Sequence, residues 1–303
     1  MNLICFDLEG PLSPQDNAYE LMKLVSKGQI FELISRYDDL LTLERREGYE
    51  PGDTLSLIVP FLLAHGVQER DIITLAEKAS LVEGAQDLIH RLSARGWEVY
   101  CISTSYQPYA LRITQRVGIP PHKVASTSFP LDEIRSHIPK QDMALVQRLE
   151  KELAGTSPDD VSLQQRLDRF FWGELPPTDL GKAMARVKPV GGRRKVEALR
   201  RFMGDSPLSQ TIVVGDSITD ARMLETVREA GGVAIAFNAN EYALPHATVG
   251  LASTSLGDLQ VVADAWEKGG KEEVEIAVRE KERQGSSTNR GHFHWLEGRR
   301  DMD

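Results

Sequence analysis

The chain has 303 residues, of which 41% are hydrophobic, and a formal net charge of −9. A chain of this size can bury a large core, and its length predicts one catalytic domain with one or two inserted segments. The acidic balance argues against a general nucleic-acid-binding protein, which usually has a basic face, and the lack of an apolar run of about twenty residues argues against a membrane-spanning segment.

The N-terminal segment 2–12 is an apolar run that ends in two acidic residues and a Gly-Pro breaker, a pattern typical of a buried strand. Asp7 and Glu9 follow the run directly. Because a carboxylate at the carboxyl end of a strand is exposed, these two residues are the first candidates for chemistry. Taken alone, such a segment is more often a turn than a catalytic site.

Residues 13–81 contain helical patterns over 18–26, 30–43 and 55–65, with Pro51-Gly52 as a break. They are inserted between the first predicted strand and the next one. We therefore expect a helical cap beside the first strand, which favours a lid over the alternative of a purely structural role.

The segment 97–105 predicts a second strand that ends in hydroxyl side chains. A hydroxyl can donate to a phosphoryl oxygen without adding charge. Ser103 is the main candidate for this role and Thr104 follows it. Read alone, Ser103 would be an ordinary polar residue at a strand end.

A second helical and highly charged stretch covers residues 128–187. Three hypotheses stay open for it: a second lid, a surface for a protein partner, or a bundle continuous with the cap. The stretch includes three consecutive aromatic residues at 170–172, for which core packing is favoured over an exposed recognition patch.

Two further segments, 191–199 and 211–220, carry charged candidates. Lys195 lies in the first turn of a predicted helix, where free backbone amides also favour an anion; a solvated helix start is the alternative. Asp216 and Asp220 follow a buried-type strand and lead into a helix. An ordinary helix cap is the alternative for this pair, but its position directly after a strand favours a site.

These strand ends would bring three or four carboxylates into one crevice, from Asp7, Glu9, Asp216 and Asp220. Such a group repels itself unless a cation lies among its members. Oxygen ligands without cysteine or histidine favour Mg²⁺. We therefore infer a magnesium site.

The segment 268–303 is predicted to be a charged tail that begins at a Gly-Gly pair. It contains a charged helical pattern over 271–283 and a flexible-looking linker over 284–291. Docking of this tail into the substrate crevice is one possible arrangement, and no sequence feature decides it.

In their order along the chain, the four segments resemble the signatures of the haloacid-dehalogenase (HAD) superfamily, matched at residues 7–10, Ser103, Lys195 and residues 215–220. The helical pattern before the second strand, at 82–92, is similar to the helix that leads into the second signature in the phosphoserine-phosphatase-like branch. The resemblance implies an α/β fold: a Rossmann-like HAD core with a mostly parallel sheet, an inserted helical cap and a second helical insert. The implied core consists of residues 1–12, 82–127 and 188–267, with the cap at 13–81, the second insert at 128–187 and the tail at 268–303.

The resemblance also implies a two-step mechanism in which Asp7 attacks phosphorus and forms an aspartyl-phosphate. Glu9 would protonate the leaving oxygen and later deprotonate water. Ser103 and Lys195, with Thr104 beside them, would hold the transferring oxygens. The implied Mg²⁺ ligands are Asp7, the main-chain carbonyl of Glu9, and Asp216, with Asp220 as a ligand or a hydrogen-bonding support.

The chain departs from the commonest family pattern at Glu9, where an aspartate is usual. A glutamate at this place resembles the phosphoserine:homoserine phosphotransferases, so transfer to an alcohol acceptor is an alternative to hydrolysis. A further alternative is a regulatory or assembly subunit of a larger complex, possibly a hydrogenase, which the second insert and the tail suggest.

The substrate is expected to be a small phosphorylated metabolite. In the similar branch, an acid after the first signature and an arginine in the cap bind the amino acid, and Asp16 stands in the place of that acid. No lysine or arginine lies between Arg46 and Arg70, so the leaving group is expected near Asp16, Asn17 and Arg45. Free phosphoserine is therefore not preferred.

The expected location is cytoplasmic. The N-terminus lacks a signal-peptide pattern, and Cys5 and Cys101 lie in predicted core strands, where free buried thiols are commoner than a disulfide. We expect neither nucleic acid nor membrane as a partner, and a protein partner through 128–187 or the tail as an open possibility.

Overall fold

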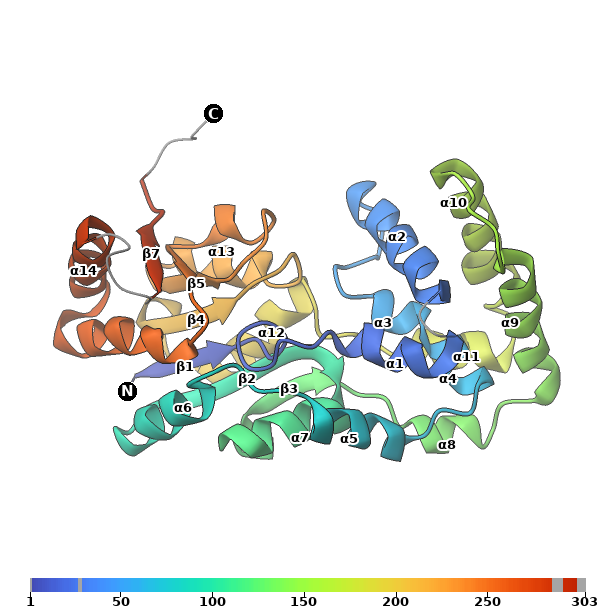
Figure 1. Ribbon diagram of the computed structural model, residues 1–303, viewed down its shortest axis with the longest axis horizontal. Helices are drawn as coiled ribbons and strands as arrows, with labels where there is room; N and C mark the ends of the chain where they lie inside the picture. The colour runs from blue at the N-terminus through green and yellow to red at the C-terminus, as the bar shows by residue number, and fades with distance from the viewer. Residues whose placement is uncertain (1, 27–28, 285–290, 299–303) are drawn as a thin grey trace.

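A seven-stranded sheet forms the centre of the computed structural model, which describes residues 2–26, 29–284 and 291–298 (Figure 1). The strand order is β3-β2-β1-β4-β5-β6-β7, and all neighbours are parallel except the antiparallel pair β6 and β7. The strands are β1 (Leu3–Phe6), β2 (Glu98–Tyr106), β3 (Val124–Thr127), β4 (Thr211–Gly215), β5 (Val233–Phe237), β6 (Val249–Ala252) and β7 (His292–Trp295).

The strands β1, β4 and β5 are mostly apolar because helices cover both faces of the sheet. Every residue of β1, β4 and β5 is buried. Helices α6 (Ala85–Ala94), α7 (Gln107–Val117) and α14 (Gln260–Gln284) pack on one face, and α12 (Arg193–Met203) and α13 (Ala221–Glu229) pack on the other. The prediction of an α/β, Rossmann-like core with a mostly parallel sheet is confirmed.

The strand order reverses between β1 and β4. The strands β2 and β3 lie on one side of β1, and β4, β5 and β6 follow on the other side. Parallel sheets of this kind bind ligands beyond the carboxyl ends of the strands at such a switch point. The residues that follow β1 and β4 therefore occupy the position from which chemistry is expected.

Most of the two inserted segments forms one helical body beyond this edge of the sheet (Figure 1). Helix α2 contacts α10, and α4 contacts both α9 and α11. This arrangement corresponds to the third hypothesis for residues 128–187, a bundle continuous with the cap. The first insert contributes α1 (Asn17–Ser26), α2 (Gln29–Leu43), α3 (Thr54–Leu57) and α4 (Val59–Ala64); the second contributes α8 (Leu131–Arg135), α9 (Lys140–Leu153), α10 (Asp160–Asp168) and α11 (Asp179–Arg186).

The consecutive aromatic residues of the second insert hold this body together. Phe170 and Phe171 lie in a π-helical segment, Arg169–Glu174, and are fully buried. The Phe171 ring stacks on Tyr37 of α2 with 5.9 Å between centroids. Trp172 is partly exposed, but its indole N–H donates to the Tyr37 hydroxyl at 2.8 Å. The aromatic run thus joins the two inserts, as the preference for core packing anticipated.

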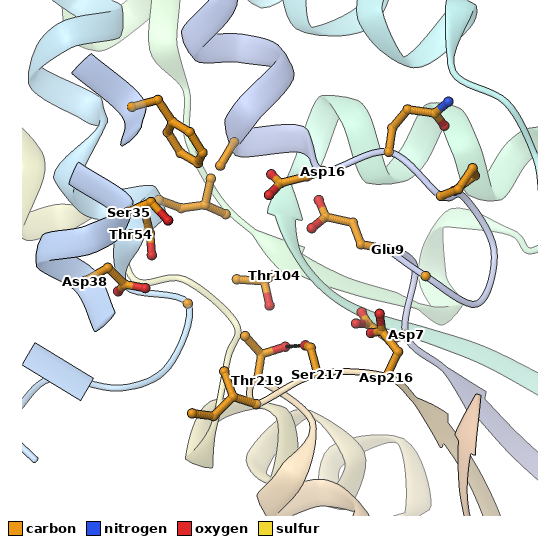
Figure 2. Close-up of a pocket in the computed structure, with 18 residues that line it drawn as sticks. Asp7, Glu9, Asp16, Ser35, Asp38, Thr54, Thr104, Asp216, Ser217 and Thr219 are labelled. Atoms are coloured by element: carbon orange, nitrogen blue, oxygen red, sulfur yellow. Dashed lines mark hydrogen bonds between the residues drawn. The ribbon is translucent and has the colours of Figure 1, made fainter. Parts of the chain in front are cut away.

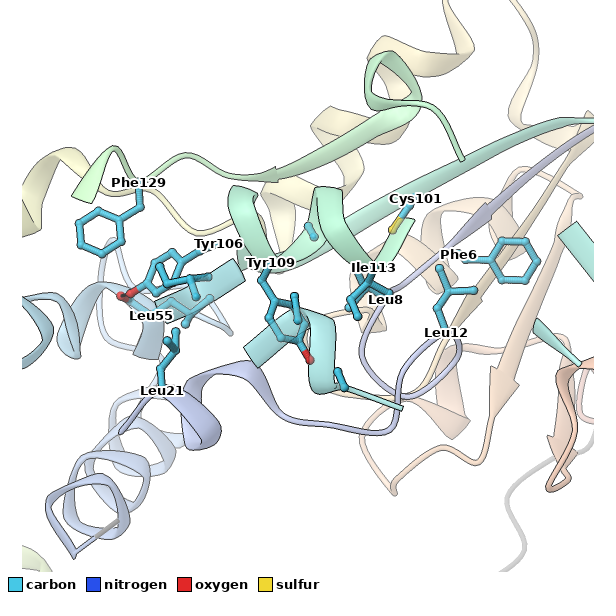
Figure 3. Packing of buried hydrophobic residues seen from close by; sticks show 14 of the residues in the cluster. Phe6, Leu8, Leu12, Leu21, Leu55, Cys101, Tyr106, Tyr109, Ile113 and Phe129 are labelled. Carbon is cyan, nitrogen blue, oxygen red and sulfur yellow. Dashed lines mark hydrogen bonds between the residues drawn. The ribbon is translucent and has the colours of Figure 1, made fainter. Parts of the chain in front are cut away.

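The apolar core is continuous from the sheet into the cap, as Figure 3 shows. Tyr106 at the end of β2 packs against Phe129 with 4.7 Å between ring centroids, and its hydroxyl donates to the Leu55 carbonyl of α3. Because Tyr106 is fully buried, the cap is packed onto the strand that carries the candidate phosphate-binding hydroxyls.

Two boundaries differ from those expected from the sequence. Helix α5 (Glu69–Lys78), expected in the cap, packs on α7 of the core. The described part of 268–303 also belongs to the core: α14 is kinked at Gly269-Gly270 and continues to Gln284, and β7 adds an edge strand on which Phe293 and Trp295 are buried. The predicted linker falls largely on 285–290, outside the described residues.

Short 3₁₀ turns complete the structure at Pro121–Lys123, Leu208–Gln210, Leu244–His246 and Leu256–Leu259. None of the described helices is long and apolar enough to span a bilayer.

Candidate active site

Asp7 and Asp216 lie next to each other because they follow adjacent strands. Asp7 comes directly after β1, and its backbone N–H donates to the Val214 carbonyl of β4 at 2.8 Å. Asp216 comes directly after β4. One oxygen from each of Asp7, Asp216 and Asp220 lies within 4.8 Å of the others. Three of the four carboxylates that the sequence predicts in one crevice are therefore brought together, all except that of Glu9.

Lys195 is the cation of this cluster. It is fully buried, and its Nζ atom lies 2.8 Å from Asp7 Oδ1 and 2.7 Å from Asp220 Oδ1. Burial alone would lower the pKa of Lys195, but Asp220 and Asp7 outweigh it and raise the pKa above its usual value. The side chain is therefore a fixed positive charge beside Asp7.

Asp220 organises the turn between β4 and α13. Its Oδ1 atom accepts from Lys195, and its Oδ2 atom accepts the backbone N–H groups of Asp216 at 3.1 Å and Ser217 at 3.2 Å. Gly215 permits this packing, because a Cβ atom there would lie 2.5 Å from Asp220 Cγ. Both Asp220 oxygens are thus engaged in holding neighbouring groups.

A glycine also permits the close approach of the first loop to Asp216. Gly10 has a φ of +83°, and a Cβ atom there would lie 2.3 Å from Asp216 Oδ2. Only glycine combines this left-handed backbone with so short a contact. The Gly-Pro breaker of the sequence is therefore part of the site.

The three carboxylates of Asp7, Asp216 and Asp220 carry more negative charge, when ionised, than the Lys195 ammonium neutralises. Burial, followed by the charge of Asp220, raises the pKa of Asp7 well above its usual value although Lys195 opposes the shift. Burial and Asp220 also raise the pKa of Asp216 to about 8. Three carboxylates balanced by one lysine fit a divalent cation, and their hard oxygen donors fit Mg²⁺.

Glu9 lies apart from this cluster, beside the start of the cap. Its Oε1 atom accepts the Asn17 backbone N–H at 3.1 Å and the Ser105 hydroxyl. Burial and the nearby Asp16 raise the pKa of Glu9 to about 7. A carboxyl group with this pKa can both donate and accept a proton near neutral pH. Ser105, which orients it, was not singled out from the sequence.

The two candidate hydroxyls of β2 are placed differently. Ser103 is fully buried, does not line the cavity at the site, and accepts the Ser105 backbone N–H at 3.0 Å. Thr104 lines the cavity, and its hydroxyl donates to the Val190 carbonyl at 3.2 Å. Of the pair, the structure presents Thr104 to a ligand.

Asp7, Asp216 and Thr104 form the floor of a cavity of about 360 Å³ between the sheet and the cap (Figure 2). The loop after β1 and the loop after β4 supply the sheet side, and α1, α2 and α3 supply the cap side. Its lining residues are Asp7, Glu9, Gly10, Pro14, Gln15, Asp16, Ala18, Phe31, Ser35, Asp38, Gly52, Thr54, Leu55, Thr104, Asp216, Ser217, Ile218 and Thr219.

The three residues expected near the leaving group have three different outcomes. Asp16 lines the cavity. Asn17 is fully buried, gives its backbone N–H to Glu9, and does not line the cavity. Arg45 is the clear correction: it is exposed in the turn after α2, with a φ of +52°, and lies outside the cavity lining. Helix α2 ends before it can direct this side chain inward.

The cap loop that contains Pro51-Gly52 reaches α12, the helix that carries Lys195. Glu50 Oε2 accepts the backbone N–H of Arg193, the first residue of α12, at 3.1 Å. Asp53 forms an ion pair with Arg194. Gly52 lies between them with a φ of +96°, and a Cβ atom there would lie 2.7 Å from Thr104 Cγ2. A hydrogen bond and an ion pair therefore connect the cap to α12, which carries Lys195.

Comparisons with known proteins agree with this fold. A family model described as a haloacid dehalogenase-like hydrolase matches residues 1–228. A gene product of Archaeoglobus fulgidus, AF1437, has a similar structure, with 33% identity, 98% of this chain and 90% of that chain covered, and a TM-score of 0.86. No curated protein matches the chain.

Two more distant structures share the fold. One is a phospho-aspartyl intermediate analogue of a phosphoserine phosphatase, with 17% identity, 86% and 97% of the two chains covered, and a TM-score of 0.55. The other is a probable phosphoserine phosphatase from Vibrio cholerae, with 16% identity, 92% and 66% covered, and a TM-score of 0.53.

Proposed function

This chain belongs to the haloacid dehalogenase-like hydrolase family, and we propose that it hydrolyses phosphomonoesters of small metabolites with Asp7 as the nucleophile. The observation that carries the proposal is the position of Asp7 on the cavity floor, at the end of β1 and 2.8 Å from the Lys195 ammonium. A carboxylate fixed beside a buried cation is placed to attack a phosphoryl group whose negative charge the same cation attracts.

In the first step, an Asp7 oxygen forms a bond to phosphorus as the bond to the leaving oxygen breaks. Glu9 donates its proton to that oxygen, which its raised pKa permits near neutral pH. In the second step, Glu9 accepts a proton from water, the water oxygen attacks phosphorus, and inorganic phosphate leaves Asp7. The products are an alcohol and phosphate.

The remaining residues act by position and charge. Lys195 attracts the phosphoryl oxygens, and Asp220 holds both Lys195 and the turn that carries Asp216. Of the two candidate hydroxyls of β2, Thr104 is the one placed to contact the transferring group, because it lines the cavity and Ser103 does not.

Asp7 and Asp216 would hold Mg²⁺, together with the main-chain carbonyl of Glu9. When bound, the ion would neutralise the charge that develops on the phosphoryl group. Because both oxygens of Asp220 already accept hydrogen bonds, we assign Asp220 a supporting role.

The fold of the phosphoserine phosphatases supports this reaction class, and one of those structures is an analogue of a phospho-aspartyl intermediate. We also propose a cytoplasmic location, which the buried free thiols Cys5 and Cys101 support.

The proposal is tested by phosphate release from a panel of phosphomonoesters with Mg²⁺, in the presence and absence of an alcohol acceptor. We expect turnover by the wild type and none by Asp7→Asn, while Asp205→Asn, which changes an exposed aspartate, keeps full activity. Turnover retained by Asp7→Asn would exclude Asp7 as the nucleophile. A phosphorylated acceptor in place of free phosphate would replace hydrolysis by transfer.

A further inference from the structure

The ionisable residues that line the active-site cavity are all acidic. They are Asp7, Glu9, Asp16, Asp38 and Asp216, and no lysine, arginine or histidine is among the described lining residues. Lys195 does not line the cavity, and its ammonium group already pairs with Asp7 and Asp220. A leaving group that enters this cavity therefore meets negative charge beyond the phosphoryl site.

Asp38 lies on the far side of the cavity from Asp7 and Asp216. Figure 2 shows it on the cap side, near Ser35 and Thr54. An ester bound with its phosphoryl group beside Asp7 would extend its alcohol portion into the space between these two ends. Asp38 is thus in position to contact a group on the alcohol rather than the phosphate.

The Asp38 carboxylate has hydrogen bonds but forms no ion pair with a lysine, arginine or histidine of the described residues. The Tyr49 hydroxyl donates to its Oδ1 atom, and a hydrogen bond from Thr54 also favours its charged form. Burial nevertheless raises the pKa of Asp38 to about 6. The neighbouring acid Asp53 differs, because it pairs with Arg194. Asp38 is half-buried, and a carboxylate in this situation is stabilised when a ligand supplies positive charge.

Asp16, the other acid on the cap side, accepts a hydrogen bond at the N-terminus of α1. Its Oδ1 atom accepts the Tyr19 backbone N–H at 2.9 Å at the beginning of α1. This hydrogen bond and the helix N-terminus both stabilise its negative charge without a ligand. Asp38 lies within α2, where no free backbone N–H groups are available to it. Burial raises the pKa of both acids, but Asp38, unlike Asp16, lies within its helix and not at the helix N-terminus.

We propose that the substrate is the phosphomonoester of a small amino alcohol without a carboxylate, and that Asp38 binds its ammonium group. A carboxylate on the leaving group would face Asp16 and Asp38 with no cation to pair with, whereas an ammonium group would pair with Asp38 and contact the hydroxyls of Ser35 and Thr54. This inference rests on the proposed phosphatase activity. The reaction breaks the P–O bond to the amino alcohol, and water supplies the hydroxyl group to phosphorus and the proton to the alcohol.

The test compares kcat/KM for esters that differ in one group: 2-aminoethyl phosphate, 2-hydroxyethyl phosphate and phosphoserine, with an aryl phosphate as a general phosphatase probe. We expect the aminoethyl ester to exceed the hydroxyethyl ester by about tenfold or more, the size of one charge-assisted hydrogen bond, and to exceed phosphoserine as well. Asp38→Asn should bring the ratio of the aminoethyl to the hydroxyethyl ester close to one. Asp39→Asn, a change at the exposed neighbouring residue, should keep the wild-type ratio.

The outcomes separate the inference from the proposed function. If Asp7-dependent turnover is present but the aminoethyl ester has no advantage, or phosphoserine is the better substrate, the inference is wrong and the phosphatase stands. If no ester, including the aryl phosphate, shows Asp7-dependent turnover, the phosphatase proposal is wrong and the inference falls with it.

A product-inhibition experiment covers the case in which Asp38→Asn does not fold. The wild type hydrolyses the aryl phosphate in the presence of 2-aminoethanol or ethylene glycol. Stronger inhibition by the amine supports an ammonium site in the cavity, and equal inhibition by the two alcohols contradicts it.

Discussion

The two ends of the active-site cavity both contain carboxylates, buried at the sheet end and half-buried at Asp38, and these carboxylates have different partners. At the sheet end, Asp7 and Asp220 contact the Lys195 ammonium, and Asp220 also accepts two backbone N–H groups. At the cap end, Asp38 accepts hydrogen bonds from neutral hydroxyls and has no ion pair within the part of the chain that the structure describes. The sheet end is thus largely preorganised for the reaction, whereas the cap end is completed by the substrate.

From this difference we infer that the sheet end stabilises the transition state and that the cap end selects the leaving group. Groups fixed by strands, backbone amides and a buried lysine can stabilise a transition state without reorganisation. A carboxylate held by side-chain hydroxyls on a helix instead selects which leaving group enters. Substitutions at the sheet end should therefore reduce turnover of every ester, and substitutions at the cap end should change the order of preference.

The largest expected effect is that of Asp7→Asn. Asparagine keeps the shape of the side chain but removes the nucleophile, so turnover of all esters should fall by about 10⁴-fold or more. The measurement is phosphate release, with thermal unfolding as the control for folding. Loss of activity on some esters only would contradict the separation of tasks.

Lys195→Met should reduce both activity and stability. The substitution leaves Asp7 and Asp220 buried without their cation, which typically destabilises a protein by about 3–5 kcal/mol. Chemical denaturation measures the stability change. Arg201→Met, at an exposed position of the same helix, should have almost no effect, and an equally stable Lys195→Met protein would argue against the ion pairs described above.

Glu9→Gln should reduce the hydrolysis of alkyl phosphates by about 10²–10⁴-fold, the usual contribution of a general acid. Aryl phosphates, whose leaving groups need less protonation, should be affected less. Because the acid must be protonated and burial raises its pKa to about 7, the wild-type rate of the first step should fall as the pH rises through about 7. A pH profile with the same basic limb in Glu9→Gln would assign that limb to another group.

Glu50→Ala should have the smallest of these effects. It removes the carboxylate that accepts the Arg193 N–H at the start of α12, a loss comparable to that of a helix cap, about 1 kcal/mol. Turnover should fall severalfold because Lys195 lies in the same turn. Glu197→Ala, on the exposed side of α12, is the matched control, and equal effects of the two variants would exclude a positioning role for the cap loop.

The sheet end could be predicted from the sequence because each of its parts has a local signal. Continuous apolar runs predict buried parallel strands, and the acids Asp7 and Asp216 follow two such runs directly. The order of these runs, with Lys195 at a helix start between them, is consistent with only one crevice at the carboxyl edge of the sheet. The helical content of both inserts was also predicted from periodicity.

The choice among the hydroxyls of β2 could not be predicted. The pairing of β2 with β3 is irregular between Ile102 and Tyr106. Simple alternation along a strand therefore does not decide which of Ser103, Thr104 and Ser105 faces the cavity. The structure places Thr104 at the cavity and Ser105 on Glu9.

The cap end could not be predicted because its signals depend on packing between distant segments. Asp38 and Asp39 are adjacent acids on one helix, and only the folded structure distinguishes them: Asp38 lines the cavity and accepts from Tyr49, whereas Asp39 is exposed. Arg45 was expected at the leaving group because it is one of few nearby cations, but the turn after α2 directs it to solvent. The edge strand β7 is only four residues long, and its partner β6 is distant in the sequence.

The central claim, that Asp7 carries the phosphoryl group, is tested most directly by trapping the intermediate. The wild type is mixed with a ³²P-labelled phosphomonoester and Mg²⁺, quenched with acid within one turnover, and digested for peptide mapping. The account predicts label on the peptide that contains Asp7 and none in Asp7→Asn. Release of labelled phosphate by the wild type with no label on that peptide at any time would contradict it.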